Sequence, residues 1–93
     1  MKASQPKELR LQSQVERGLA AQRLVDDEFV TAWFDEHRSD LVKKMLGADI
    51  GDDQTRRDAA IQIKTLDALR RHISSEASLG RKAKDDQRKL TDG

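Results

Sequence analysis

The sequence contains no cysteine, one proline, one tryptophan, two phenylalanines and no tyrosine, and these scarcities exclude several kinds of protein. Without cysteine the chain has no disulfide and no thiolate metal ligand. No apolar run approaches the about 20 residues that a membrane-spanning helix needs, so we expect no membrane partner. Because Pro6 is the only proline, no later position carries the residue that most often interrupts a helix.

Charge is what the chain has in abundance. Charged residues make up 38% of its 93 residues and hydrophobic residues 35%, against the usual ~25% and ~45–50%. This balance is typical of a helical protein with wide solvated faces. A chain this short forms one domain with a thin core, and its helices commonly bury further surface in an oligomer or against a partner. The first residues lack the apolar stretch of a secretory signal, so we expect a cytoplasmic location.

The charges are unevenly distributed along the chain, although the formal net charge is only +1. Residues 1–25 carry five basic and two acidic groups, residues 26–58 five and ten, and residues 59–93 eight and five. An acidic middle between two basic ends suggests charge complementarity within the fold or between copies. Chance clustering on solvated helix faces is the alternative interpretation.

Apolar residues recur at helical spacing in three stretches, 11–25, 29–46 and 59–77, and strand-like alternation does not occur. The pattern of the last two is the clearest, and a short polar loop of two glycines and three aspartates joins them. Two such helices pack antiparallel. The sequence therefore predicts an all-α fold, an antiparallel helical hairpin plus an N-terminal helix in a three-helix arrangement, with a basic C-terminal extension.

The expected ends of these helices come from capping residues. The acidic cluster at 26–28 either starts a new helix or lies within a continuous one. Gly47 stops the middle helix, Asp52, Asp53 and Thr55 are rival caps of the last helix, and Gly80 ends it. We therefore expect these segments: a flexible or frayed N-terminus at 1–12, a single helical domain at 13–80, and a basic tail or helix extension at 81–93.

Signs of catalysis or metal binding are missing from the pattern. His37 and His72 each stand alone, without a second ligand at helical spacing. The loop of residues 49–53 lacks the order of aspartates, glycine and glutamate that a calcium loop needs. No serine, threonine or lysine lies on a glycine-rich turn beside a base. We expect no enzyme activity, no cofactor and no metal, and a function carried by surfaces.

One broad apolar stripe is the main candidate for a protein-interaction site. Its members are Trp33, Phe34, Leu41, Met45, Leu66, Leu69 and Ile73. The stripe forms the core of the hairpin, and any part of it left exposed is a partner site. Trp33 is the expected anchor, because tryptophan dominates the energetics of many interfaces. The expected partner is a protein, through self-association or a larger assembly.

Nucleic-acid binding is the alternative. Clustered basic side chains give affinity for phosphates through counterion release. The candidates are Arg56, Arg57, Arg70, Arg71, Arg81, Lys82 and Lys84. Acidic residues stand close to each pair, the net charge is near zero, and no aromatic platform for stacking bases is evident. A small DNA-binding accessory protein of packaging or regulation is therefore the second hypothesis.

The region from Leu24 to Lys82 resembles a type of small helical protein encoded by tailed bacteriophages and prophages. The resemblance lies in the acidic turn before Phe29-x-x-x-Trp33-Phe34, the polar loop with Asp53 and Arg56-Arg57-Asp58, the Leu66-x-x-Leu69-x-x-x-Ile73 helix, and Gly80 before a basic end. Such proteins are encoded among head and packaging genes, and their function is generally unassigned. The resemblance implies a role in particle assembly, in the host cytoplasm or the virion, and carries over no functional residue.

Overall fold

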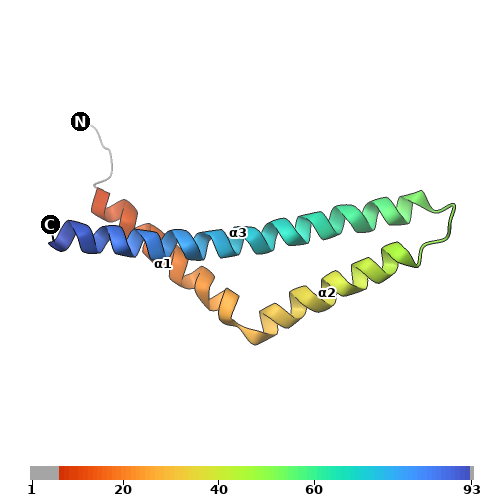
Figure 1. The fold of residues 1–93 in the computed structure, drawn as a ribbon, viewed down its shortest axis with the longest axis horizontal. Coiled ribbons are helices and arrows are strands. Elements are labelled where there is room, and N and C mark those ends of the chain that lie inside the picture. The colour runs from red at the N-terminus through yellow and green to blue at the C-terminus, as the bar shows by residue number, and fades with distance from the viewer. Residues whose placement is uncertain (1–6, 93) are drawn as a thin grey trace. The chain divides into compact units, whose positions relative to one another are not determined.

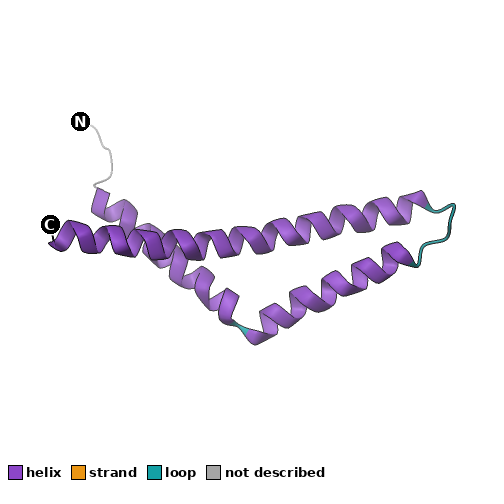
Figure 2. Cartoon of the chain, in the orientation of Figure 1, coloured by secondary structure: helices purple, strands orange, loops and turns teal. Residues whose placement is uncertain are grey.

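A computed structural model describes residues 7–92 of the chain. They form three helices, α1 (Lys7–Asp26), α2 (Glu28–Leu46) and α3 (Asp53–Asp92), and no strand occurs among them (Figures 1 and 2). The predicted all-α class, with an N-terminal helix before a hairpin, is confirmed. Part of the segment predicted to be frayed, residues 1–6, lies outside the described residues, and residues 7–12 are helical.

The helices form two compact units, one of residues 1–26 with 73–93 and the other of residues 27–72. The second unit is the hairpin, made of α2 and the first half of α3 (Figure 1). The first unit contains α1 and the second half of α3. Residues 81–93 were expected as a tail or a helix extension, and α3 continues through them to Asp92. The single domain expected at 13–80 stays a prediction.

The break between α1 and α2 falls at Asp27, which settles the alternative that the sequence left open. Asp27 has extended backbone angles, and its carboxylate Oδ1 accepts a hydrogen bond of 3.0 Å from the amide of Val30. A side-chain acceptor at this position satisfies an amide that the first turn of a helix leaves without a partner. The acidic cluster therefore starts α2 rather than lying inside a longer helix.

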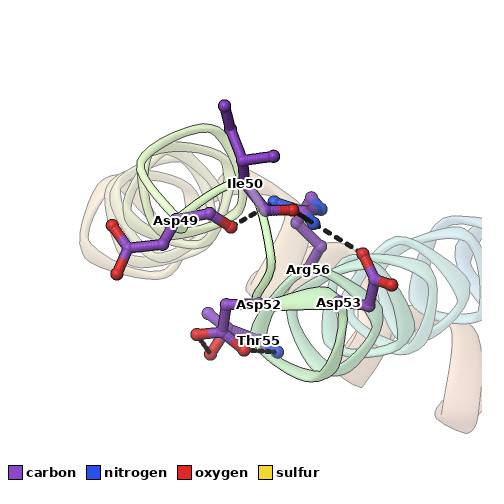
Figure 3. Close-up of polar contacts among 6 residues, drawn as sticks. All are labelled: Asp49, Ile50, Asp52, Asp53, Thr55 and Arg56. Atoms are coloured by element: carbon purple, nitrogen blue, oxygen red, sulfur yellow. Dashed lines mark hydrogen bonds and ion pairs between the residues drawn. The ribbon is translucent and has the colours of Figure 1, made fainter.

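The start of α3 is capped by Asp52 and not by its rivals Asp53 and Thr55. The amide of Thr55 donates to Oδ1 of Asp52 at 3.1 Å, and the Thr55 hydroxyl donates to Oδ2 at 2.6 Å (Figure 3). These donors, the hydroxyl first, lower the pKa of the Asp52 carboxyl. Thr55 is thus the third residue of the helix, where it donates to the cap.

Arg56 ties the loop back onto α3. Its guanidinium donates to the backbone carbonyls of Asp49 and Ile50, both at 2.7 Å, and to the Asp53 carboxylate at 2.6 Å (Figure 3). On the α2 side, the Gly47 amide donates to the Lys43 carbonyl at 2.8 Å and ends that helix as predicted. Both ends of the connection are therefore fixed by polar contacts.

The core of the hairpin is small. Its buried apolar side chains are Phe34, Leu41, Ala59, Ile63 and Leu66. On each helix they recur at intervals of three, four or seven residues, which keeps them along one face. This face is narrower than the apolar pattern of the sequence, so several large apolar side chains remain at the surface.

The other unit packs through small residues. Gly18 and Ala21 of α1 and Ala77, Gly80 and Ala83 of α3 are buried. A Cβ atom on Gly80 would lie 2.5 Å from the Cα of Gly18, so the two backbones touch where α1 meets α3. The prediction that Gly80 ends the helix was wrong. The residue is helical, and it lacks a side chain because the backbone of α1 occupies that space.

Candidate functional site

One side of the hairpin is closed by two ion pairs, and we call it the salt-bridged side. Arg70 donates to the Asp35 carboxylate at 2.7 Å, and Arg38 holds both oxygens of Asp67 at 3.0 and 3.2 Å. The Arg70 guanidinium also lies 5.5 Å from the ring centroid of Phe34, within the range of a cation–π contact. These contacts set the register of α2 on α3.

The pair of Arg38 and Asp67 shifts the pKa of both partners. The hydrogen bond from Arg38 is the main cause that lowers the pKa of Asp67, and the same contact raises the pKa of Arg38. Because the groups are exposed to solvent, screening limits what the pair adds to stability. Its geometric effect, fixing how the two helices lie against each other, is the more important one.

The opposite side of the hairpin, which we call the open side, carries a shallow apolar groove. The groove has a volume of about 260 Å³ and is lined by Trp33, His37, Gln62, Thr65, Leu66 and Leu69. On α2 Trp33 is two residues before Asp35, and on α3 Leu69 is two residues after Asp67. Two residues correspond to a rotation of about 200° around a helix axis, so the members of each pair point to opposite sides. The groove and the ion pairs therefore lie on opposite sides of the same helix pair.

Trp33 is half exposed and is held in place by its neighbours. The side chain has 47% of its surface accessible, yet its ring stacks on His37 at 4.9 Å and meets the edge of Phe34 at 5.4 Å. Leu69, across the groove, is 49% exposed. An aromatic side chain that is ordered before binding loses less conformational entropy when a partner covers it.

Two further exposed apolar residues extend the open side. Phe29 lies one turn before Trp33 on α2 and is 77% exposed, and Ile61 lies one turn before Thr65 on α3 and is 56% exposed. With Trp33 and Leu69 they give each helix two large apolar side chains directed away from the core. Apolar residues gathered at one site, rather than scattered singly, indicate an interaction surface.

The structure sorts the seven residues predicted for protein interaction. Phe34, Leu41 and Leu66 are buried in the hairpin core. Met45 is half-buried in the same unit, and Ile73, also half-buried, belongs to the other unit. Trp33 and Leu69 remain at the surface.

The predicted interaction site did not include three residues that line the groove, His37, Gln62 and Thr65. It also did not include Phe29 and Ile61, which extend the open side. The helical spacing of His37 and Phe29 from Trp33, four residues each, could have found two of them.

The basic residues predicted for nucleic-acid binding are mostly engaged within the chain. Arg56 binds the loop, and Arg70 binds Asp35. Arg81 donates to Gln22 at 2.5 Å, and Lys82 lies 3.7 Å from Asp86. Of the other three, Arg71 acts on Asp67, whose pKa it helps to lower, while Arg57 and Lys84 make no hydrogen bond or ion pair with residues 7–92.

A larger groove of about 490 Å³ lies in the other unit, beside the contact of Gly18 with Gly80. Three of its polar side chains already pair with one another: Arg81 donates to Gln22, and Gln22 donates to Asp26 at 3.0 Å. Its apolar lining contains no aromatic residue. The smaller groove at Trp33 is therefore the better candidate, because it has an ordered aromatic side chain at its edge.

The residues that the structure describes include no group of three or more histidine or acidic side chains placed to hold a metal ion. Within the same residues, no helix is long and apolar enough to span a membrane. Comparisons of the chain with protein-family models, with curated proteins and with solved structures find no match.

Proposed function

We propose that the chain is a non-enzymatic protein–protein interaction module and that its docking surface is the open side of the hairpin. The observation that carries the proposal is the position of Trp33 and Leu69. Both are large apolar side chains, about half exposed, on the two walls of one groove, and opposite the side that ion pairs close. A partner that covers them removes this apolar surface from water.

The mechanism is docking of an apolar surface against the ordered Trp33 ring. Interface residues that dominate binding commonly cost about 2 kcal/mol or more when truncated, and tryptophan is enriched among them. The neighbouring polar side chains of Gln62 and Thr65 provide hydrogen-bonding groups at the groove, which fix the orientation of a partner. The ion pairs on the far side keep α2 and α3 in register while the partner docks.

Site-specific photocrosslinking in cells that produce the protein tests the proposal without assuming a partner. A photoreactive amino acid replaces Thr65 on the open side in one variant and Ser39 on the salt-bridged side in the control. Both positions are exposed, and Ser39 lies one turn after Asp35. We expect a crosslinked protein adduct from position 65 and none from position 39. Equal labelling from both positions, or none from 65, would refute the docking surface.

A role in phage particle assembly remains a prediction from the resemblance, because no comparison links the chain to such proteins. DNA binding is the alternative, and the contacts favour it less. Of its seven candidate side chains, Arg56, Arg70 and Arg81 already donate hydrogen bonds within the chain, and Lys82 forms an ion pair with Asp86. Binding phosphates would require those contacts to break or to be shared.

A further inference from the structure

His37 is the one residue lining the open-side groove whose side chain changes charge near neutral pH. The other five lining side chains are an indole, an amide, a hydroxyl and two aliphatic groups, none of which titrates in that range. Histidine changes between its neutral and its positively charged form at pH values between about 5 and 8. The groove is therefore uncharged when His37 is neutral, and its α2 wall is positive when His37 is protonated.

The stack of His37 on Trp33 places this charge against the expected anchor of the docking surface. The ring centroids are 4.9 Å apart and the ring planes differ by 23°. Both side chains come from α2, four residues apart, so the helix itself holds one ring over the other. A cation over the face of an indole is attracted by it, so a protonated imidazole should stay in the stack. Protonation thus changes the charge of the groove and leaves the Trp33 ring in place.

The imidazole of His37 is accessible to protons. The side chain is exposed, and it makes no hydrogen bond or ion pair within residues 7–92. On the same side of α2, Asp40 lies three residues further along and Lys44 lies two turns further along, and both are exposed. The neighbouring Arg38 is already paired with Asp67 on the far side. No contact of this side chain must therefore break before it takes up a proton from water.

The part of α3 that lines the groove carries no carboxylate to neutralise a protonated His37. Its four lining side chains are uncharged. On the open side, Asp58 and His72 lie one turn beyond the two ends of that lining, and Asp58 already accepts a hydrogen bond from Gln54 at 2.8 Å. Lys64 lies one turn before Asp67, on the salt-bridged side. A charge on His37 therefore depends on water for its stabilisation.

We propose that pH regulates the docking surface through His37, so that a partner docks on the neutral imidazole and is released when the imidazole is protonated. The inference rests on the proposed function and adds the control of that same site. A partner that covers the Trp33 ring also covers the ring stacked on it. Removing a charged imidazole from water without a counter-ion is unfavourable. The free protein then binds a proton that the complex excludes, so the affinity falls as the pH decreases.

The fluorescence of Trp33 tests the titration of the stack without any partner, because this is the only tryptophan of the chain. A protonated imidazole in contact with an excited indole accepts an electron and quenches its emission, whereas the neutral ring is a poor acceptor. We expect the emission to decrease as the pH is lowered from about 8 to about 5. The decrease should be absent from His37→Phe, which keeps an uncharged ring beside the indole, and should remain in the control His72→Gln. Circular dichroism over the same range checks that the helices stay folded.

The photoreactive amino acid at position 65 tests the regulation itself. Extracts of the producing cells are brought to about pH 7.5 or about pH 5.5 before irradiation, and the readout is the ratio of the two adduct yields within each variant. We expect the wild type and His72→Gln to lose up to about tenfold of the adduct at the lower pH, because one proton is taken up by the free protein and excluded by the complex. The ratio for His37→Phe should stay near one. Any change that remains there belongs to the partner and is subtracted.

Two further variants keep the test decisive. His37→Gln, also uncharged, provides the ratio if the phenylalanine itself blocks docking. His37→Arg is charged at both pH values and should give little adduct at either. The inference is overturned if the wild-type ratio equals that of the uncharged variants, if His37→Arg docks as well as the wild type, or if Trp33 shows no fluorescence change that depends on His37.

These outcomes separate failure of the regulation from failure of the proposed function. An adduct from position 65 whose yield does not depend on the charge of His37 overturns the regulation and leaves the docking surface intact. The absence of any adduct specific to position 65 at both pH values refutes the docking surface, and the regulation with it, even where the fluorescence shows that the stack titrates.

Discussion

Gly18 of α1 and Gly80 of α3 touch through their backbones, so that a Cβ atom on Gly80 would lie 2.5 Å from the Cα of Gly18. Alanines at 21, 77 and 83, all buried, surround this contact. Because no large side chain separates the helices there, the unit gains its packing from close backbone approach. Each glycine is therefore required by its neighbour on the other helix and not by its own backbone angles.

We expect Gly80→Ala to destabilise the protein, although alanine is the better helix former. The gain in helix propensity is about 1 kcal/mol, whereas overpacking a tight contact costs about 1–3 kcal/mol. Urea unfolding followed by circular dichroism measures the difference. Gly51→Ala is the control, because a Cβ there meets no atom within 4 Å, and it should change stability little. A more stable Gly80→Ala protein would contradict the contact.

Trp33 and Phe34 are neighbours in sequence with opposite roles, and truncation should separate them. Phe34 is 6% exposed, so Phe34→Ala should cost about 3–5 kcal/mol of unfolding free energy. Trp33→Ala should cost about 1–2 kcal/mol in the dilute protein, because half of its surface is already in water. The same change should abolish the crosslinked adduct that position 65 forms with a partner. A cost for Trp33→Ala as large as that for Phe34→Ala would make it a core residue.

The lowered pKa values of Asp52 and Asp67 predict a loss of stability in acid. A carboxyl whose pKa is lower in the folded state than in the unfolded state stabilises the fold above its unfolded pKa of about 4, and this contribution is lost as the pH falls through the folded value. Thermal unfolding at decreasing pH should therefore show a falling melting temperature below about pH 4. Asp67→Asn and Arg38→Gln should each reduce this dependence by a similar amount, since Arg38 is the main cause of the Asp67 shift.

Affinity for duplex DNA distinguishes the interaction module from the nucleic-acid alternative. Most candidate cations are engaged inside the chain, so we expect no appreciable DNA binding at physiological salt. The double variant Arg70→Ala with Arg71→Ala should reduce any residual binding only by weakening nonspecific attraction to phosphates. Fluorescence anisotropy with labelled DNA at several salt concentrations measures both. Tight binding that falls steeply with salt and disappears in this double variant would favour DNA binding instead.

The sequence predicted the helices because apolar residues recur at helical spacing, and it predicted their pairing because a short loop joins two such stretches. The sequence pattern placed the end of α3 too early, at Gly80, because a glycine at the end of an apolar helical pattern usually stops a helix. The contact between Gly80 and Gly18, which explains the glycine instead, joins residues far apart in the sequence and cannot be read from the local pattern. The pattern could not separate Trp33 from Phe34, since both fall on one broad stripe. The register set by Asp35 with Arg70 decides which of them faces α3.

The connection between α2 and α3 also bears on whether two copies of the chain could exchange helices. Exchanging α3 between subunits would require the loop to open, and opening it would break the three contacts of Arg56 and separate Arg56 from the carbonyls of Asp49 and Ile50. A swapped dimer is thus disfavoured at its hinge. The hairpin therefore keeps its own α2 and α3 together, and the two helices can separate only after the loop contacts of Arg56 are lost.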